Sequence, residues 1–412
     1  EPRLRVISRQ FEEVVRRLGV VFQRGPAGIE RGLESLSEGQ QSLFYFALAA
    51  AVFDLEREAV STGVDGFNAD AIAVPALTVF AIEEPENHLS PFYLARIVNQ
   101  VRSLVAEGAG QAVITSHSPA VLSRVEPPEV RYCRCDPTTH RTSVRAISLP
   151  EDDEDAAKFV RGAMLAYPEL YFARFVVLVE GDSERVVLPR LAQSIDLLID
   201  PAFVAIVPLG GRHVQHFWRL LSGIEIPYAT LLDLDLGRDG GGFGRVKTAI
   251  EKLLEIGVDE KDLLGLSDGK LLSRVRLAKM HTWKEVEHLE GWVDSLEKHA
   301  VFFSSPLDVD LAMIAAFPDA YAKIVPQGGG PKMTIEKAAE AILGEGGLSY
   351  YDGLRKPLRD LLPGYRYHFL THSKPATHLR VLVGIDDATL KAKMPSTLRA
   401  VLKHVKKHLR RD

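Results

Sequence analysis

Acidic residues follow short apolar runs at several places in the chain, and carboxylates in that position can hold metal ions. Phe175–Val179 leads directly into Glu180, and Glu184 lies four residues later, about one helical turn further on. Gly181 permits a tight turn from a strand into a helix. The pattern predicts that both carboxylates point to one place above the edge of a sheet.

A second acidic pair follows the apolar run at 228–232. Period-two alternation predicts that the side chains of Asp233 and Asp235 lie on the same side. Four carboxylates at strand ends repel one another unless cations neutralise them, and oxygen ligands of this kind select Mg²⁺ or Mn²⁺. Each pair alone is typical of a helix cap or a turn, so it is the four together that indicate a metal centre.

The first part of the chain carries motifs that fit a nucleotide site. Leu77–Ile82 is followed at once by Glu83 and Glu84. At the end of a strand, one carboxylate can hold a Mg²⁺-bound water and the next can polarise the attacking water. His117 follows another apolar run and can contact a γ-phosphate. A helix start at Glu84 and a structural histidine are the simpler interpretations of each residue taken alone.

A further motif precedes these two. Ser37, Gly39 and Gln40 stand where a helix rich in Ala, Leu and Phe begins. Hydroxyl and backbone N–H groups at a helix N-terminus can bind a phosphate, although a plain helix cap explains the same residues.

The elements that must position these residues alternate between strands and helices. We expect a parallel strand–helix–strand unit, then a hairpin, and after the acidic run at 151–155 a second α/β unit. Strands are expected at residues 76–82, 111–115, 175–179, 203–209, 228–232 and 301–304, helices at 91–106, 183–194 and 214–221, and a hairpin at 130–146.

The expected fold class is α/β with three segments. Residues 1–150 form the first unit, 151–173 form an acidic linker and a connecting helix, and 174–412 form the second unit. Residues 245–300 have a mostly helical pattern and are expected to be an insertion in the second unit.

The order of motifs in the first unit resembles the ABC-type ATPase domain of the SMC, RecF and OLD (overcoming lysogenization defect) proteins. The resemblance places Ser37, Gly39 and Gln40 in the signature motif, which contacts ATP bound to another subunit. It makes Glu83 the Walker B acid, Glu84 the catalytic base and His117 the switch histidine, with a D-loop at 86–89.

This sequence departs from the ATPase pattern in two ways. Glu83 stands where Asp is usual, and the phosphate-binding pattern G-x-x-x-x-G-K-[ST] occurs nowhere. We therefore expect residues 1–150 to be the C-terminal lobe of such an ATPase, with the missing lobe upstream of Glu1. We also expect no ATP hydrolysis by this chain alone.

The second unit resembles the Toprim fold, with E-G after its first strand and D-x-D after its third. An ABC-type ATPase followed directly by Toprim is the arrangement of the OLD family endonucleases, and this resemblance covers nearly the whole chain. It implies that Asp308 and Asp310 complete a second metal site. It also implies that Lys374, in a late S-K-P motif, stabilises charge on the scissile phosphate, although a surface lysine before a turn is the simpler interpretation.

The implied reaction is DNA cleavage by two divalent ions, in which one activates a water and the other holds the leaving oxygen. Glu180, Asp233 and Asp235 are assigned to one ion, and Glu184, Asp308 and Asp310 to the other. Mg²⁺ or Mn²⁺ is the expected cofactor, Ca²⁺ is expected to bind without supporting cleavage, and ATP is expected in the complete protein.

Contact with DNA is expected at a basic C-terminal helix and a glycine-rich loop. Apolar residues of that helix recur at helical spacing, which predicts a docked face opposite a basic one that binds phosphates. A helix that only docks, with its basic face in solvent, and a plain turn at Arg238 fit the same residues. The expected DNA contacts are Arg238, Lys403, Lys406, Lys407 and Arg410.

Composition excludes several other classes. The 412 residues carry 50 Lys and Arg against 55 Asp and Glu, a net charge of −5, so a tail-driven polyanion binder is excluded. Apolar runs are too short to cross a bilayer, and two cysteines one residue apart suit a reducing cytoplasm, so no membrane association is expected.

Three alternatives remain beside the nuclease. The first is a non-catalytic repair or recombination scaffold that keeps a DNA-binding Toprim module. The second is a topoisomerase, which needs a nucleophilic tyrosine in a separate domain that nothing in this sequence marks. The third is a primase, which needs a zinc-binding domain that two cysteines cannot make. The resemblance further implies a homodimer, a helicase partner and a role in phage defence or DNA repair.

Overall fold

The computed structural model divides the chain into two compact units, Glu1–Val125 and Glu126–Asp412. Each unit is described by itself. The residues described are 19–23, 28–62, 73–87, 89–106, 108–136, 139–147, 149, 154–210, 214–266 and 269–409.

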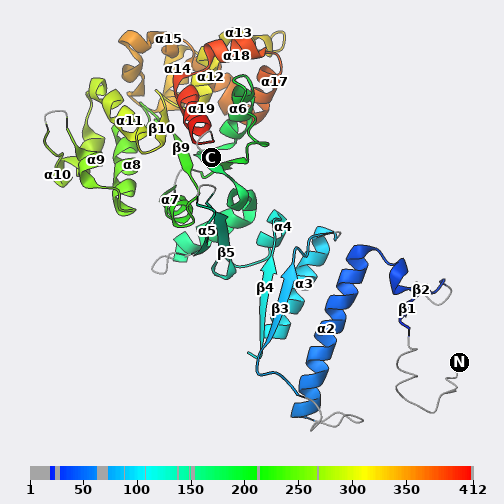
Figure 1. The fold of residues 1–412 in the computed structure, drawn as a ribbon. Helices are drawn as coiled ribbons and strands as arrows, with labels where there is room; N and C mark the ends of the chain where they lie inside the picture. The colour runs from blue at the N-terminus through cyan, green and yellow to red at the C-terminus, as the bar shows by residue number, and fades with distance from the viewer. Residues whose placement is uncertain are drawn as a thin grey trace, which may run out of the picture. The chain divides into compact units, whose positions relative to one another are not determined.

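The first unit contains the predicted strand–helix–strand unit. β3 (Thr78–Glu83) and β4 (Gly110–Thr115) are parallel, with Glu83 opposite Thr115 at the carboxyl end. α3 (Pro91–Val105) connects them and packs against β4 through an apolar stripe (Figure 1). α2 (Glu38–Ser61) adds a ring contact, because Phe53 meets Phe80 of β3 edge to face at 5.2 Å. The predicted order is confirmed.

The predicted hairpin is also present, but it groups with the second unit. β5 (Arg131–Cys135) pairs antiparallel with β6 (Thr142–Ala146). Arg145 reaches Glu225 of the second unit with an Nη2–Oε1 distance of 2.5 Å. α5 (Glu154–Ala166) begins inside the acidic run, whose first three residues lie outside the described part. The domain boundary near residue 150 stays a prediction.

A four-stranded parallel sheet forms the centre of the second unit, in the order β10-β9-β7-β8. Its strands are apolar because helices cover both faces of a parallel sheet. All five residues of β7 are at most 1% exposed. Their bounds are β7 Phe175–Val179, β8 Val204–Pro208, β9 Tyr228–Asp233 and β10 Val301–Ser304.

Helices from distant parts of the sequence pack on this sheet. α6 (Asp182–Gln193) follows β7 and contacts β8 and α17 (Lys374–Leu382), while α19 (Ser396–Leu409) contacts β7, β9 and β10 (Figure 1). The core runs continuously from the sheet into these helices. The last helix contributes Leu398, Val401, Leu402 and Val405 to this core.

The segment between β9 and β10 is helical, as its pattern indicated, and its status as an insertion stays a prediction. Its helices are α8 Phe243–Glu255, α9 Glu260–Leu264, α10 Arg274–Ala278 and α11 Leu289–Glu297. Further helices follow β10: α12 Val309–Ala316, α13 Pro318–Lys323, α14 Ile335–Leu343 and α18 Asp387–Lys393.

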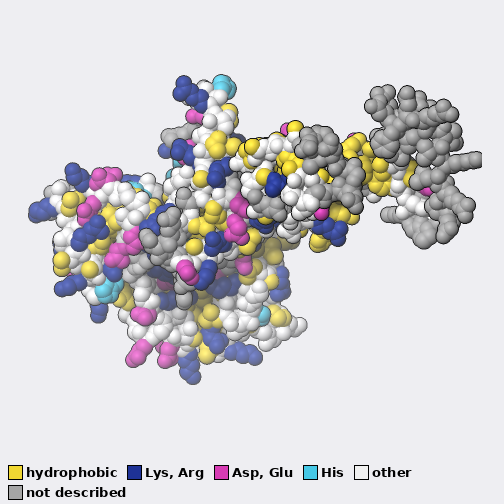
Figure 2. Space-filling view, turned by 90° about the horizontal axis from the view of Figure 1, so that it is seen from below, with side chains coloured by type: hydrophobic (Ala, Val, Ile, Leu, Met, Phe, Trp, Pro, Cys, Tyr) yellow, Lys and Arg dark blue, Asp and Glu magenta, His cyan; other side chains and the backbone are white. Residues whose placement is uncertain are grey.

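The surface matches the near-neutral composition. On the face that Figure 2 shows, Lys and Arg side chains are interspersed with Asp and Glu. Among the described residues, none belongs to a helix that is both long and apolar enough to cross a membrane.

Candidate metal centre

The parallel sheet brings its acidic residues to one edge, because the carboxyl ends of parallel strands coincide. Glu180 follows β7, and Asp233 ends β9 directly beside Ser304 of β10. The backbone N–H of Asp233 donates to Glu180 Oε1 at 3.1 Å. Beyond the strands, the N–H of Asp235 donates to the carbonyl of Leu307 at 2.9 Å, so the two loops stay paired.

A cavity of about 420 Å³ lies at this edge. Six of its lining residues are site residues predicted from the sequence: Glu180, Glu184, Asp233, Asp308, Asp310 and Lys374. The structure thus brings these six together from β7, α6, β9, α12 and α17. Asp235, assigned to the first ion with Glu180 and Asp233, does not line this cavity.

The chemistry of these donors fits a hard divalent cation. Asp233 Oδ1 is buried without a hydrogen-bond partner in the described part of the chain, and burial together with the neighbouring carboxylates raises the pKa of Asp233 well above its usual value. Burial raises the pKa of Glu184 to about 8, and it raises the pKa of Glu180 against the opposing charge of Arg245. Within the described residues no three acidic, His or Cys side chains are close enough together to coordinate one ion.

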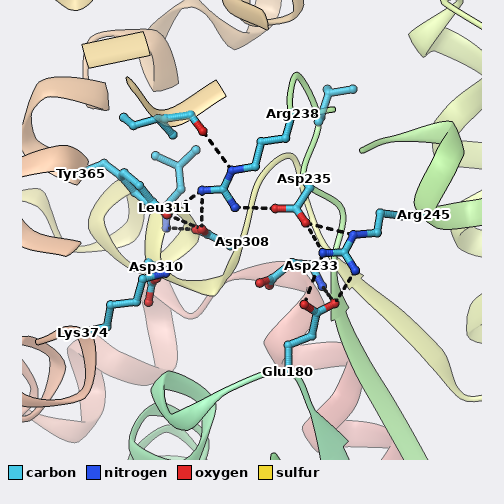
Figure 3. Close-up of polar contacts among 12 residues, drawn as sticks. Glu180, Asp233, Asp235, Arg238, Arg245, Asp308, Asp310, Leu311, Tyr365 and Lys374 are labelled. Carbon is cyan, nitrogen blue, oxygen red and sulfur yellow. Dashed lines mark hydrogen bonds and ion pairs between the residues drawn. The ribbon is translucent and has the colours of Figure 1, made fainter. Parts of the chain in front are cut away.

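Two arginines take the place beside Asp235. Asp235 lies past the end of β9 with φ of +52°, so strand alternation does not extend to it, although its carboxylate lies close enough to add to burial in raising the pKa of Asp233. Arg245 Nε donates to Asp235 Oδ2 at 3.0 Å and its Nη1 lies 3.3 Å from Glu180 Oε1, while Arg238 binds Asp235 Oδ1 at 2.5 Å (Figure 3). A role for Asp235 as a metal ligand stays a prediction.

A glycine lets the loop that carries Arg238 fold back on the strand end. A Cβ on Gly241 would lie 1.8 Å from the carbonyl oxygen of Asp235. Gly237, at φ +94°, also lies close to Gly347, since a Cβ on Gly347 would lie 2.4 Å from the Gly237 oxygen. The glycine-rich loop is therefore a closely packed turn at these positions.

Asp308 is buried where α12 begins. Its Oδ1 accepts from the N–H of Leu311 at 2.9 Å and caps the helix, and its Oδ2 accepts from the hydroxyl of Tyr365. Arg238 Nη2 lies 3.6 Å from the same Oδ2. Burial and the charge of Asp310 raise the pKa of Asp308 to about 6, although Lys374 and Arg238 oppose the rise.

Asp310 holds the predicted catalytic lysine. Lys374 Nζ lies 2.6 Å from Asp310 Oδ2 (Figure 3). His378 Nε2 lies 2.8 Å from Asp310 Oδ1. His378 is fully buried, and its Nδ1 lies 2.6 Å from the hydroxyl of Tyr321. Burial alone would raise the pKa of Asp310, but the His378 hydrogen bond and the charge of Lys374 lower it to about 2.

Sequence reasoning missed three residues of this network: Arg245, Tyr365 and His378. Arg245 lies in the helical segment between β9 and β10, and nothing in its spacing from Asp235 indicates a contact. His378 does carry a signal, because it lies four residues after Lys374 and so on the same face of α17.

The nucleotide-motif residues lie in the first unit. Ser37 caps α2 reciprocally with Gln40, with Gln40 N–H donating to Ser37 Oγ at 3.4 Å, and Gly39 is buried in the first turn. Glu83 ends β3. Glu84 follows at φ +42°, and its Oε1 lies 3.7 Å from His117 Nε2.

Glu86 links the two strand ends of this unit. Its Oε1 accepts from Ser116 Oγ at 2.8 Å and from the N–H of His117 at 3.0 Å. Its Oε2 is buried without a partner among the described residues. The predicted D-loop also includes residue 88, which lies outside the described part.

The basic C-terminal helix docks as predicted. Leu398, Val401, Leu402 and Val405 are buried, and Lys403 and Lys407 are exposed. Lys406 Nζ donates to the carbonyl of Ile195 at 2.7 Å, and Arg238 is engaged at the metal centre. Arg410 lies outside the described residues.

Family models match both units. Residues 171–235 match the overcoming lysogenization defect protein-like TOPRIM domain, and residues 2–123 match an AAA domain described as putative AbiEii toxin of a type IV toxin–antitoxin system. Endonuclease GajA of Bacillus cereus (strain HuB5-5) is 22% identical over 233 residues, which are 51% of this chain and 33% of that protein. The chain thus spans about a third of the length of this curated relative.

Two solved structures align with part of the chain. The C-terminal region of the Xanthomonas campestris pv. campestris OLD protein aligns at 18% identity and a TM-score of 0.37, covering 59% of this chain and 96% of that one. The corresponding region of the Burkholderia pseudomallei OLD protein aligns at 16% identity and a TM-score of 0.34, covering 58% and 99%.

An ATPase region joined to a Toprim domain with acids at the carboxyl ends of its strands defines an ATPase–Toprim protein. The TOPRIM match and the similarity to Endonuclease GajA support an OLD-like protein of this class, and the expected α/β fold class is confirmed.

Proposed function

We propose that this chain carries the cleavage centre of a divalent-metal-dependent DNA endonuclease that an ATPase regulates. The observation that supports it most is the cavity of about 420 Å³, where buried carboxylates from three strand ends lie beside Lys374. Uncompensated carboxylates are costly to bury, and Asp233 Oδ1 keeps a free lone pair for a cation.

Glu180 and Asp233 would hold one divalent ion, with Asp235 joining them if the arginines release it. Glu184 and Asp308 would contribute to a second. Bound ions of this kind supply electrophilic stabilisation of a phosphate and lower the pKa of a water. The ligands must be deprotonated, so binding would displace the proton that the raised pKa keeps on Glu184 at neutral pH.

Among the described residues that line this cavity, Lys374 of α17 is the basic one. Asp310 fixes its ammonium group, and His378 fixes Asp310, so the lysine is oriented before DNA arrives. An ammonium group held in this way stabilises negative charge that develops on a phosphate oxygen. Asp310 therefore serves better as the anchor of Lys374 than as a metal ligand.

The proposal extends to the first unit. Glu84, beside His117, would act at ATP bound to the complete protein. Ser37 and Gly39 would contact ATP across a homodimer. ATP bound in this way would regulate DNA cleavage. A helicase partner and a role in phage defence or DNA repair belong to the same proposal.

Supercoiled plasmid incubated with the purified chain and Mn²⁺ tests the proposal. We expect nicked or linear products that EDTA prevents, whereas relaxed topoisomers indicate a topoisomerase and unchanged DNA indicates a scaffold. Glu180→Gln should lower the rate at least about 100-fold, because one ligand of the first ion is lost. Glu340→Gln, on the exposed face of α14, is the matched control and should cleave like the wild type.

A further inference from the structure

The helical segment between β9 and β10 contains a second large cavity, of about 960 Å³, apart from the metal centre. It lies between α8, α11 and the segment that joins α9 to α11. The residues that matter here are Phe243, Arg276, Trp283, Lys284, Trp292 and Lys298.

Two of the three tryptophans of the chain line this cavity. Trp283 and Trp292 are partly exposed, whereas Trp218 is fully buried and its Nε1 donates to Thr230 at 2.8 Å. Phe243 supports Trp283 edge to face at 5.4 Å, and the Arg276 guanidinium lies 5.8 Å from the Trp283 ring centroid. Large aromatic faces held open to solvent in this way can stack on another flat ring.

The charges around these tryptophans are mainly positive. Arg276, Lys284 and Lys298 line the cavity, and within the described part of the chain none of the three has a carboxylate partner in a salt bridge. Glu285 is the acidic residue among the described lining residues, and it lies 3.8 Å from His288. An anion would therefore meet unneutralised cations there.

A neighbouring cavity of about 700 Å³ shares Lys284 with this one, and its lining includes Arg238, Lys284 and Arg355 together with Asp239, Glu345 and Asp352. Arg238 in turn contacts Asp235 and Asp308 at the strand ends. A phosphate chain leaving the carboxylates would thus pass Arg238 and Lys284 before it reaches the two tryptophans.

We propose that this cavity, named the tryptophan subsite, binds a single-stranded nucleic-acid segment next to the cleavage site. A base stacks on Trp292 or Trp283, and Lys284 and Lys298 contact the flanking phosphates. Aromatic rings and cations in one groove are the means by which proteins bind single strands, whereas the bases of a duplex already stack on one another. The inference rests on the proposed function in taking DNA as the ligand, and it concerns binding instead of cleavage.

Fluorescence anisotropy of a labelled oligothymidylate with the full chain in EDTA tests the subsite. Trp292→Ala should weaken binding about tenfold, and Trp292→Phe should restore most of the affinity because the ring is kept. Removing both lysines by Lys284→Gln with Lys298→Gln should reduce the slope of log affinity against log salt by about 1.4, which is 0.7 for each phosphate contact.

Lys337→Gln, an exposed lysine on α14 outside the subsite, is the matched control and should bind like the wild type. Tryptophan emission adds a second readout, since the oligonucleotide should quench Trp283 and Trp292 while buried Trp218 keeps its signal. Wild-type affinity in Trp292→Ala and in the double lysine variant overturns the inference, as does a loss confined to duplex DNA. The binding experiment measures no cleavage, so the two proposals can fail separately. A chain that binds the oligonucleotide through Trp292 but does not nick plasmid refutes the proposed function and leaves the tryptophan subsite standing.

Discussion

At the scale of single residues, the candidate metal centre is a set of carboxylates, several of which pair with Lys and Arg side chains of the chain itself. Arg245 bridges Glu180 and Asp235, Arg238 bridges Asp235 and Asp308, and Lys374 binds Asp310. Asp233 and Glu184 have no such cation at their oxygens in the described structure, and their raised pKa values follow from burial. A bound cation would therefore stabilise the ionised forms of these two residues most.

Glu184→Gln should therefore change the pH dependence of stability. The pKa of Glu184 rises from 4.5 to about 8 on folding, so between these values the folded chain keeps a proton that the unfolded chain has released, and stability falls as pH rises. Glutamine cannot ionise, so the variant should gain stability over the wild type with rising pH, by up to about 4 kcal/mol at pH 8. Thermal unfolding in EDTA at pH 5 and pH 8 measures this.

Equal differences in melting temperature at the two pH values would contradict the raised pKa. Mn²⁺ supplies the internal control, because the cation should stabilise the wild type at pH 8 more than it stabilises Glu184→Gln.

Lys374→Gln should lower plasmid cleavage about 100- to 1,000-fold, because it removes a fixed positive charge at the scissile phosphate. Lys374→Arg should recover part of the rate, since the charge can still reach Asp310. Initial rates at saturating Mn²⁺ give the comparison, with circular dichroism to show that each variant is folded. A folded Lys374→Gln chain that cleaves at the wild-type rate would leave the lysine as a structural partner of Asp310.

At the scale of elements, apolar runs with clear ends were predictable and the residues beyond them were not. The strands Phe175–Val179 and Val301–Ser304 occur as predicted, because continuous apolar residues flanked by polar ones leave one place for a buried strand. The alternation rule fails at Asp235, because this residue adopts a left-handed conformation after β9, and its partners Arg238 and Arg245 follow only three and ten residues later. Pairing between residues far apart in the chain, such as Tyr365 with Asp308, leaves no local pattern.

Neighbouring residues of helix α19 have different expected roles, one in core packing and the next in phosphate binding. Leu402 is 1% exposed against the sheet, and the next residue, Lys403, is exposed. Leu402→Ala should reduce the free energy of unfolding by about 3 kcal/mol, because it leaves a cavity in the core. Lys403→Gln should leave stability unchanged and reduce the salt dependence of DNA binding by about one phosphate contact.

Urea unfolding measures the stability of both variants. DNA affinity at several salt concentrations measures the number of phosphate contacts that each variant keeps. A Lys403→Gln chain with an unchanged salt slope would show that α19 only docks.

At the scale of the whole molecule, the position of the domain boundary is open to direct test. The hairpin β5–β6 and α5 group with the second unit, and Arg145 contacts Glu225 there, although the sequence suggested a boundary near residue 150. A fragment of residues 126–412 should unfold cooperatively with the stability of the second unit in the full chain. A fragment of residues 174–412 should be less stable, because it lacks the hairpin and α5.

Urea denaturation of both fragments decides between the boundaries. Equal stability of the two would support a linker that starts near residue 150 and contributes nothing to the second unit.

The order in which the sheet is built has a consequence for synthesis of the chain. Its acids come from strands far apart in the sequence, Lys374 arrives later on α17, and α19, near the chain's end, covers β7, β9 and β10. Parallel pairings between such distant segments form slowly, and a nascent chain emerges from its N-terminus first. The acidic cavity at the strand ends is therefore incomplete until α17 and α19 have emerged from the ribosome, so nascent chains that stop before Lys374 lack the cation that lines it.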